Sequence, residues 1–470
     1  MPGIASYGAY IPQTRLPLAL ISGRPAKEGG PEKAVANYDE DAITMGVSAA
    51  LDCLAGFDRA SVEAVYFAST SYAMREKQAA VLVAKALDLP AAVSTSDHAG
   101  SLRAGTAALE AALNAVAAGS VRNALVVIAD ARLGAPRGAL ESKLGDGAAA
   151  FLVSDTHTIA DYRGQASIAN ELQDQWRIDG EAFTHSWEDR FVVQEGYTPN
   201  LVDALQGYFE KTGTSPDDYA KAALYAHDAR SVAGVAKAAG LSREQLQDPL
   251  FGKLGNTGCA FAPMLLVAAL ESAQPGDGLL AASYGDGAQV LGFSTTDHIG
   301  KLDARRGIAW HLANRRALAS YDTYLKSRSL DPKEWDAGAD LGLSATIRFR
   351  ERDADISMVG ARCTSCGQVH FPTQRVCYKC YAKDQWEPYR LSDKRGKLLA
   401  YTFDYFFPSS EPPTIMIMTE VDGCRVQVQL TNTTPDEVRL DLPVEYVFRV
   451  IHQAGGKPNY FWKASPSQAS

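Results

Sequence analysis

The sequence predicts an α/β protein built from two similar halves, followed by a small metal-binding β domain. The phrase Gly-Asp-Gly-Ala occurs twice, at 145–148 and 285–288, each time between two apolar segments of strand type. Helices and strands follow the same order around both copies, which favours an internal duplication of a βαβ-type unit over a shared turn motif. Beyond residue 359 the pattern changes to two Cys-x-x-Cys pairs and then to short strand candidates. This change is typical of a zinc ribbon joined to an all-β barrel.

The composition excludes several classes of protein. The chain has 470 residues, of which 46% are hydrophobic and 21% charged, as expected for a globular protein of two or three domains. The net charge is −9 without any block of lysine and arginine, so we expect no nucleic-acid partner. We expect no membrane span, because the apolar runs are broken well before the ~18–20 residues that a bilayer requires. No signal peptide is visible, and four of the seven cysteines form the two pairs, so we expect a cytoplasmic protein with a metal rather than disulfides.

The first half contains alternating strands and helices. Strands are expected at 3–12, 62–69, 124–129 and 149–153, and helices at 39–51, 77–87 and 104–118. The helix at 39–51 begins with Asp39-Glu-Asp41, and acidic residues in a first turn suit the helix dipole. The helix from Ala104 is rich in Ala and Leu, which favour helix. The stretch before it, 95–101, is predicted to be a polar loop aimed at the helix N-terminus, a suitable place for anion stabilisation or an activated nucleophile.

The second half repeats this order, and the chain then changes character. Helices are expected at 201–211, 231–239 and 264–272. Strands are expected at 222–226 and 278–283, and a last strand is expected to end near residue 294. The predicted domains are a first half (1–160), a second half (161–298), a helical linker (299–358), a zinc ribbon (359–384) and a β-barrel (385–470). Aromatic side chains of the barrel offer a stacking surface for nucleic acid, a reading that the acidic charge argues against. They are Tyr401, Phe403, Tyr405, Phe406 and Phe407.

The two cysteine pairs predict a structural zinc site. Each Cys-x-x-Cys places two thiolates on one tight turn, and the pairs Cys363/Cys366 and Cys377/Cys380 supply four soft ligands. A closed shell of four thiolates leaves no open position for a substrate, so the metal stabilises the fold. The alternative is a ribbon that has lost its metal.

Five polar residues of the two halves are candidate site residues. His227 ends a strand, Asn256 lies in a glycine-flanked loop, and Tyr284 precedes the second Gly-Asp-Gly phrase. Asp97 and His98 lie in the polar stretch before the helix at 104. Taken one at a time, such residues are more often structural than catalytic, so their common order along the chain carries the argument.

These segments resemble the thiolase superfamily, and within it the archaeal and bacterial 3-hydroxy-3-methylglutaryl-CoA (HMG-CoA) synthase group. The matching motifs are Ser6–Pro12, Asp39–Met45, Arg103–Thr106, Gly145–Ala148, Asp174–Arg177, Tyr225–His227, Gly255–Asn256 and Ser283–Gly285. The C-terminal part looks like the rubredoxin-like zinc ribbon and OB-fold module that accompanies many thiolase-like enzymes. The resemblance implies a duplicated five-layer αβαβα fold, a homodimer and an acyl-CoA substrate, with coenzyme A as part of that substrate.

The resemblance also implies roles for individual residues. In this superfamily a nucleophilic Cys at a helix N-terminus works with a His, an Asn and a Glu. The His matches His227 and the Asn matches Asn256, while Tyr284 lies on the glycine-rich loop that borders the pocket. The Cys position, however, falls on Leu102, and the Glu position falls on Thr70.

The missing nucleophile directs the functional prediction. Leu102 cannot carry an acyl group, which excludes a thioester intermediate at this position. We expect a carbon–carbon lyase, an aldolase or retro-aldolase acting on a 3-hydroxyacyl-CoA. His227 and Asn256 would stabilise an enolate, and Tyr284, His98 or Asp97 would act as acid or base. The alternatives are an HMG-CoA synthase-like acyltransferase with a displaced nucleophile such as Cys259, and a non-catalytic CoA-binding scaffold subunit.

Overall fold

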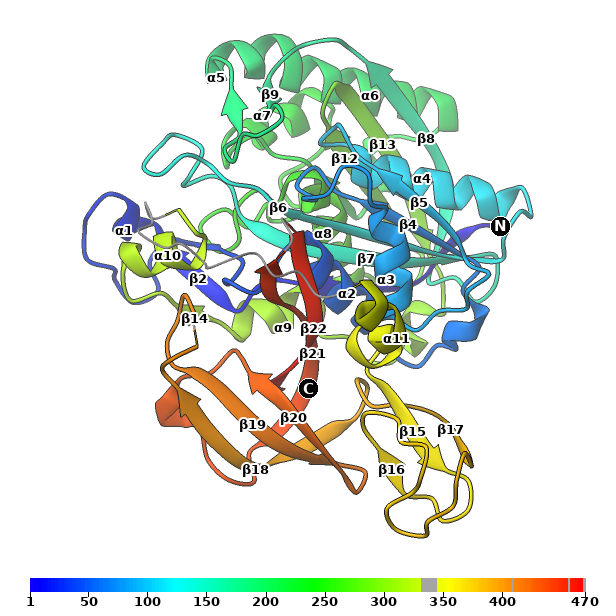
Figure 1. The fold of residues 1–470 in the computed structure, drawn as a ribbon. Coiled ribbons are helices and arrows are strands. Elements are labelled where there is room, and N and C mark those ends of the chain that lie inside the picture. Colours follow the sequence, from blue (N-terminus) through cyan, green and yellow to red (C-terminus); the bar gives the residue numbers. More distant parts are fainter. Residues whose placement is uncertain (331–344, 408, 455–456, 468–470) are drawn as a thin grey trace. The chain divides into compact units, whose positions relative to one another are not determined.

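The computed structural model describes residues 1–330, 345–407, 409–454 and 457–467, and the chain divides into two compact units. Unit 1 comprises Met1–Asn37 and Asp41–Tyr324, and unit 2 comprises Tyr38–Glu40 and Leu325–Ser470. Figure 1 shows the ribbon coloured along the chain. The short segment Tyr38–Glu40 therefore belongs to the C-terminal unit, although the residues on both sides of it belong to the first.

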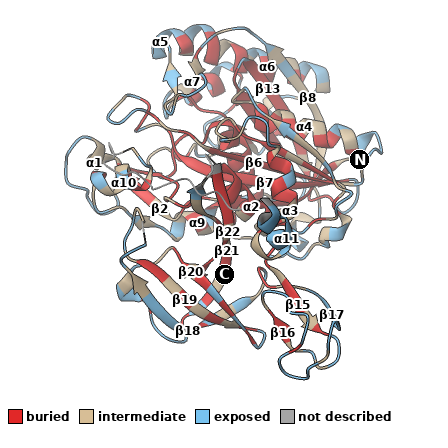
Figure 2. Ribbon diagram, viewed as in Figure 1, coloured by how far each residue is buried: buried red, intermediate tan, exposed pale blue. Residues whose placement is uncertain are grey.

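Unit 1 is built on a nine-stranded sheet with the order β11-β12-β13-β8-β1-β7-β6-β4-β5. Its strands are β1 (Gly3–Tyr10), β4 (Ala64–Ala68), β5 (Ser94–His98), β6 (Asn123–Ala131), β7 (Asp146–Ser154), β8 (Ala160–Ala169), β11 (Lys221–Leu224), β12 (Gly278–Tyr284) and β13 (Gly287–Thr295). The pairing between the two halves, β1 with β8, is confined to Gly3 with Asp161 and Ile4 with Ala160. The strands β6 and β7 are coloured as buried in Figure 2.

The two halves repeat one pattern of strand pairing. In the first half β4 and β6 are parallel, β6 and β7 antiparallel, and β7 pairs antiparallel with β1. In the second half β11 and β12 are parallel, β12 and β13 antiparallel, and β13 pairs antiparallel with β8. The two Gly-Asp-Gly-Ala phrases stand at the start of the equivalent strands β7 and β13. The predicted duplication is confirmed.

The helices form three layers around the two halves of the sheet. They are α2 (Ala42–Cys53), α3 (Ala79–Ala86), α4 (Ala104–Ala117), α6 (Thr198–Thr212), α7 (Ser231–Ala238) and α8 (Phe261–Ser272). Helices α4 and α8 contact each other and strands of both halves, whereas α2 and α3 pack on the first half, α6 packs on the second, and α7 packs on α6. This is the predicted five-layer αβαβα arrangement. The close approach at the centre depends on Gly105, because a Cβ atom there would lie 2.3 Å from the carbonyl oxygen of Cys259.

Some predicted elements differ from the structure. Helix α2 begins at Ala42 with Asp41 as its N-cap, and Asp39 and Glu40 lie outside it, so the predicted acidic first turn was wrong. The stretch predicted as a loop before α4 contains a strand, β5, which pairs parallel with β4 at the sheet edge. Strand β8 was not predicted.

The predicted linker 299–358 is divided between the two units. Its ordered elements are α9 (Gly307–Ala313), β14 (Arg316–Ala317), α10 (Tyr321–Ser327) and α11 (Ala345–Asp355). Strand β14 joins β2 (Thr14–Pro17) and β3 (Glu32–Ala34) in a small sheet of unit 1, and residues 331–344 lie outside the described residues.

Unit 2 contains a zinc-ribbon sheet and a closed β-barrel. The ribbon strands are β15 (Val359–Cys363), β16 (Val369–His370) and β17 (Trp386–Arg390). The barrel strands are β18 (Arg395–Asp404), β19 (Thr414–Val421), β20 (Cys424–Leu430), β21 (Pro443–Ala454) and β22 (Lys457–Pro466), closed in the order β18-β19-β20-β22-β21. The barrel confirms the predicted all-β module.

The segment Tyr38–Glu40 is bound to the barrel by buried charges. The Asp39 carboxylate accepts hydrogen bonds from Thr431 Oγ1 at 3.0 Å and Lys463 Nζ at 2.9 Å, and Glu40 Oε1 lies 2.9 Å from Arg449 Nη2. Burial alone would raise the pKa of Asp39, but the charges of Lys463 and Arg449 outweigh burial and lower that pKa. Two acidic residues far from the barrel in sequence thus neutralise cations of its interior.

Candidate active site and zinc site

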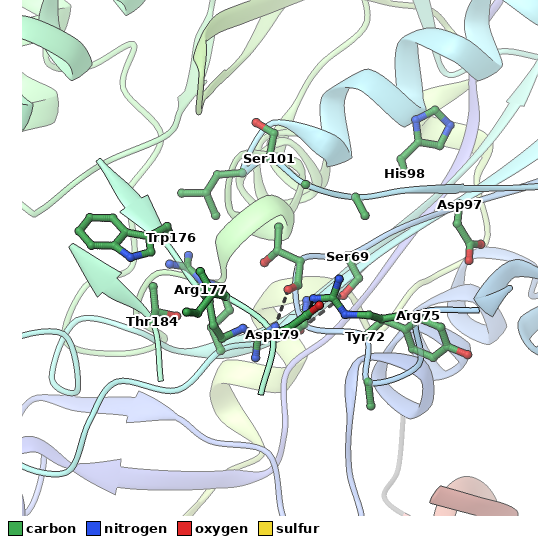
Figure 3. A pocket seen from close by; sticks show the side chains of 18 of the residues that line it. Ser69, Tyr72, Arg75, Asp97, His98, Ser101, Trp176, Arg177, Asp179 and Thr184 are labelled. Atoms are coloured by element: carbon green, nitrogen blue, oxygen red, sulfur yellow. Dashed lines mark hydrogen bonds and ion pairs between the residues drawn. The ribbon is translucent and has the colours of Figure 1, made fainter. Parts of the chain in front are cut away.

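Unit 1 contains a cleft of about 1110 Å³, which is large enough for a substrate of cofactor size. Its walls are the segment after β4 (residues 69–78), the segment 97–102 before α4, residues 174–184 and the turn Gly285-Asp286. Residues 174–184 include part of a short hairpin of β9 (Gln175–Trp176) and β10 (His185–Ser186). Figure 3 shows Asp97 and His98 on one side of this cleft and Trp176 and Thr184 on the other.

Leu102 lines the cleft in the turn before α4, where the resemblance to the superfamily places the nucleophile. It packs against Gly285, since a Cβ atom at Gly285 would lie 3.0 Å from the Cβ atom of Leu102. No cysteine is among the residues that line the cleft. Cys259 is fully buried, and burial, followed by the charge of Asp130, raises the pKa of its thiol well above the ordinary value. A buried, protonated thiol is a poor nucleophile.

Asp97 and His98 both line the cleft, but they differ in their contacts. The Asp97 carboxylate accepts hydrogen bonds from the backbone N–H groups of Ala79 (2.7 Å) and Ala80 (2.9 Å) at the start of α3. It therefore serves as a cap for that helix. His98 Nε2 has no hydrogen-bond partner among the described residues, and burial lowers the pKa of its imidazole against the opposing charge of Asp97. His98 remains a candidate base.

His227, Asn256 and Tyr284 are all buried and lie behind the cleft wall rather than in it. The Asn256 side chain donates to the carbonyl oxygen of Ala226, next to His227, at 3.1 Å and accepts from the N–H of Gly258 at 2.9 Å. The ring of Tyr197 lies 6.2 Å from His227 and 5.5 Å from Tyr284, centroid to centroid. The structure therefore places His227 and Tyr284 on one buried tyrosine, and it places Asn256 on the residue next to His227.

The imidazole of His227 has a single charged neighbour at its Nε2 atom. Its Nε2 atom lies 3.4 Å from Oδ1 of Asp189, a half-exposed carboxylate that also binds Lys143, but this contact is not a hydrogen bond, and neither Nε2 nor Nδ1 has a hydrogen-bond partner among the described residues. The phenol of Tyr284 has its pKa raised, first by burial and then by the nearby carboxylate of Asp174. The raised pKa means that Tyr284 stays protonated near neutral pH, so it can donate a hydrogen bond but cannot act as a base.

Asp130, a residue not singled out from the sequence, joins the two halves of the site. Its Oδ1 atom accepts from Ser69 Oγ (3.1 Å), the Thr70 N–H (2.7 Å) and Ser71 Oγ (2.9 Å). Its Oδ2 atom accepts from Thr70 Oγ1 (2.9 Å) and the Cys259 N–H (2.8 Å). Thr70, at the position of the superfamily's Glu, is thus a donor to this carboxylate, which ties the segment after β4 to the loop that carries Asn256.

Arg132 and Asp174 were also missed, and both are buried residues that border the cleft. Arg132 donates to Gln175 Oε1, and its Cδ atom lies so close to Gly258 that a Cβ atom there would approach within 2.8 Å. Burial raises the pKa of Asp174 against the opposing hydrogen bond from its neighbour Gln175. These two residues connect the cleft with the buried group behind it.

The four predicted cysteines form one cluster in unit 2. The ligand atoms of Cys363, Cys366, Cys377 and Cys380 all lie within 4.8 Å of one another. Individual Sγ–Sγ distances are 3.7 Å for Cys363 and Cys380 and 3.6 Å for Cys366 and Cys377. Tetrahedral zinc with bonds of about 2.3 Å requires sulfur atoms about 3.8 Å apart, so the cluster fits the ion.

Comparison with known proteins shows which family the chain belongs to. The chain is 31% identical over 341 residues to the hydroxymethylglutaryl-CoA synthase of Methanocaldococcus jannaschii, covering 70% of this chain and 99% of the relative. The chain belongs to the hydroxymethylglutaryl-CoA synthase family. The enzyme of the same name from Aeropyrum pernix is 33% identical over 339 residues, which cover 69% of this chain and 94% of that enzyme.

Solved structures and the zinc-ribbon match agree with this assignment of the fold. A crystal structure of an HMG-CoA synthase complexed with CoA aligns with a TM-score of 0.65 at 19% identity, covering 73% of this chain and 94% of that one. The 3-oxoacyl-[acyl-carrier-protein] synthase III of Aquifex aeolicus aligns with a TM-score of 0.56 at 19% identity, covering 63% and 100%. Residues 353–387 match the family described as "ChsH2, rubredoxin-like zinc ribbon domain". The predicted thiolase fold and zinc ribbon are both confirmed.

The comparisons favour one of the predicted activities over the others. The relatives named above are synthases, so the family supports the condensing alternative, and nothing in these comparisons supports the lyase that the sequence led us to expect first. None of the helices in the described part of the chain combines the length and apolar character needed to span a membrane.

Proposed function

We propose that this chain acts on acyl-CoA thioesters and catalyses aldol-type carbon–carbon bond chemistry without an acyl-cysteine intermediate. The family supplies the CoA thioester as substrate class, because the relatives are HMG-CoA synthases. The single observation that carries the rest is the cleft wall, in which Leu102 stands at the nucleophile position and no cysteine is present.

The groups around the cleft suit enolate chemistry. Removing a proton next to a thioester carbonyl requires a base, and the negative oxygen that forms requires donors. Asp174 and His98 both border the cleft and are candidate bases. The amide of Asn256 and the imidazole of His227 are candidate donors behind it, and the phenol of Tyr284 can return a proton to the product alkoxide.

The condensing direction of the reaction agrees with the family. The cleaving direction is the reverse of the same reaction and uses the same site. An enolate attacking a carbonyl gives a 3-hydroxyacyl-CoA, and the reverse reaction releases an aldehyde or ketone. Both directions pass through one enolate, so the residues that stabilise it serve both.

A second candidate function is acyl transfer of the HMG-CoA synthase type, with Cys259 as a displaced nucleophile. Family membership favours it, while the complete burial of Cys259 and its raised pKa argue against it. A homodimer through unit 1, a cytoplasmic location and a scaffold role without catalysis are further predictions from the sequence.

The test combines turnover with intact-mass measurement. We expect a panel of acyl-CoAs and 3-hydroxyacyl-CoAs to be joined to or released from aldehydes and ketones, with no acyl adduct on the protein. Cys259→Ala should retain this turnover, because the thiol has no role in the proposed reaction. An acyl adduct on Cys259, with turnover lost in the Cys259→Ala variant, would establish the acyl-transfer alternative. Absence of turnover in the presence of acyl-CoA binding would favour the scaffold.

Leu102→Cys provides a matched positive control for the mass measurement. The side chain at 102 lines the cleft, so a thiol placed there should become acylated by a bound acyl-CoA. Acylation of this variant together with an unmodified wild-type protein would show that the acyl group reaches position 102 and finds no nucleophile there.

A further inference from the structure

Arg132 is a buried cation without a partner anion. The chain has three buried arginines among its described residues, Arg15, Arg132 and Arg449. Arg15 lies 3.8 Å from a Glu32 carboxylate oxygen, and Arg449 lies 2.9 Å from one of Glu40. Arg132, which is 6% exposed, forms no ion pair with any described carboxylate, and its Nη1 atom has no hydrogen-bond partner. The buried Asp130 carboxylate also borders Gly258, beside the Arg132 side chain, but forms no ion pair with it. A buried charge is costly unless it is paired, so this guanidinium is suited to bind a further anion.

The surrounding structure fixes the position of this guanidinium. Its Nη2 atom donates to Gln175 of the β9–β10 hairpin, and its Cδ atom packs against Gly258 in the loop that carries Asn256. Its positive charge also acts on the neighbouring buried phenol of Tyr225, where it lowers the pKa against the larger, raising effect of burial. Arg132 is therefore held at the border between the cleft and the buried residues of the candidate site.

The other arginines of the cleft differ in both exposure and pairing. Arg75 is exposed and forms an ion pair with Asp179. Arg177 is exposed and donates from Nη2 to the carbonyl oxygen of Thr70 at 2.8 Å. Only Arg132, among the arginines that line the cleft, combines burial with an unused donor.

We propose that Arg132 binds an anionic oxygen of the acyl part of the substrate. The inference rests on the proposed function, because it assumes an acyl-CoA in the cleft. Two sources of such an oxygen share this chemistry: a carboxylate carried by the acyl chain, and the enolate oxygen formed at the thioester carbonyl. A guanidinium suits both, because it presents fixed N–H donors with a permanent positive charge.

Two substitutions test the site without relying on one variant. Arg132→Lys keeps the charge but removes the fork of donors. Gln175→Glu keeps Arg132 and places a carboxylate beside it, so the new ion pair should compete with the substrate oxygen. This second variant gives buried Arg132 a partner and should fold even if Arg132→Lys is unstable.

The readouts separate the two sources of the oxygen. Calorimetry would give the affinity of the full-length protein for a carboxyacyl-CoA and for a neutral acyl-CoA of equal chain length. Solvent deuterium exchange at the acyl α-carbon would give the rate of enolate formation. A carboxylate ligand predicts that both variants lose about 10-fold to 100-fold in affinity for the carboxyacyl-CoA alone. An enolate ligand predicts unchanged affinities and an exchange rate that falls by a similar factor.

Arg177→Gln is the matched control, because it removes an arginine of the same cleft that already has a partner. Because Arg177→Gln acts on the two ligands only through the net charge of the cleft, it should change the affinities for the carboxyacyl-CoA and the neutral acyl-CoA equally. The proposal is overturned if Arg132→Lys and Gln175→Glu change neither quantity more than twofold, or if Arg177→Gln reproduces their selectivity. The affinities are measured by binding alone and the exchange rates are compared with that of the wild type. A failure of the proposed reaction is therefore distinguishable, because the wild type itself would then bind acyl-CoA without exchange or turnover.

Discussion

Replacement of Asp130 by Asn should destabilise unit 1 and disturb the candidate site from within. The carboxylate is fully buried and accepts five hydrogen bonds, three from the segment Ser69–Ser71 through backbone and side-chain groups, one more from the Thr70 hydroxyl and one from the Cys259 N–H. An amide has the same shape but replaces one accepting oxygen with an N–H₂ group. The variant therefore isolates the accepting capacity of this position from its volume.

The expected loss of stability follows from the two groups that donate hydrogen bonds to Oδ2. The Thr70 hydroxyl can rotate and accept a hydrogen bond from the new N–H₂ group, whereas the backbone N–H of Cys259 cannot. One buried donor is left unsatisfied, which costs about 1–3 kcal/mol, and loss of the charge weakens the remaining bonds by roughly 1 kcal/mol. We expect a loss of about 2–4 kcal/mol in the free energy of unfolding of unit 1.

Urea-induced loss of far-UV circular dichroism measures this change. Thr70→Val is the matched control, because it removes one hydroxyl donor and leaves the carboxylate with four, so it should cost at most about 1 kcal/mol. Hydrogen exchange at the amides of Thr70 and Cys259 should accelerate in the Asn variant. If the unfolding free energy changed by less than about 0.5 kcal/mol, the view of Asp130 as the link between the two loops would be refuted.

Two further predictions concern unit 2. Cys377→Ser should abolish the binding of one zinc ion per chain, measured by atomic absorption, whereas Cys424→Ser should retain it, because Cys424 lies outside the four-cysteine cluster. The lowered pKa of Asp39 means that its contribution to stability is present above its unfolded value of 3.8 and is lost as the pH falls through the folded pKa. A pH series of unfolding experiments should show this acid-induced loss in the wild type and not in Asp39→Asn.

The fold could be predicted because its signals are local. The Gly-Asp-Gly-Ala phrases and the apolar strands beside them lie within a few residues of each other, and the structure places them at equivalent strands, β7 and β13. Asp39 and Glu40 show the limit of such reasoning. Acidic residues before a helix indicate its first turn, but here Lys463 and Arg449, distant in sequence, bind them in unit 2. No local sequence pattern around Asp39 and Glu40 indicates these distant partners.

The candidate site was only partly predictable for a related reason. His227, Asn256 and Tyr284 were identified from their motifs. The structure places the rings of His227 and Tyr284 beside Tyr197 and the amide of Asn256 on the carbonyl oxygen of Ala226. Arg132 and Asp130 were missed because their importance lies in contacts across the fold. Their sequence did carry a signal, since charged residues directly after the buried run 124–129 mark the end of a strand where a site is commonly built.

The leucine at position 102 and the family's condensing chemistry can be reconciled by the enolate. A site that stabilises an enolate accelerates addition and cleavage equally, because both reactions cross the same transition state. The nucleophilic cysteine would determine how the acyl group is held, whereas the donors and the base determine whether the carbanion forms. Under the proposed function, Leu102 removes the first role, and Asp174, His98 and Arg132, which line the cleft, would provide the second. The direction of the reaction is then set by the relative free energies of the CoA esters rather than by the residues of the site.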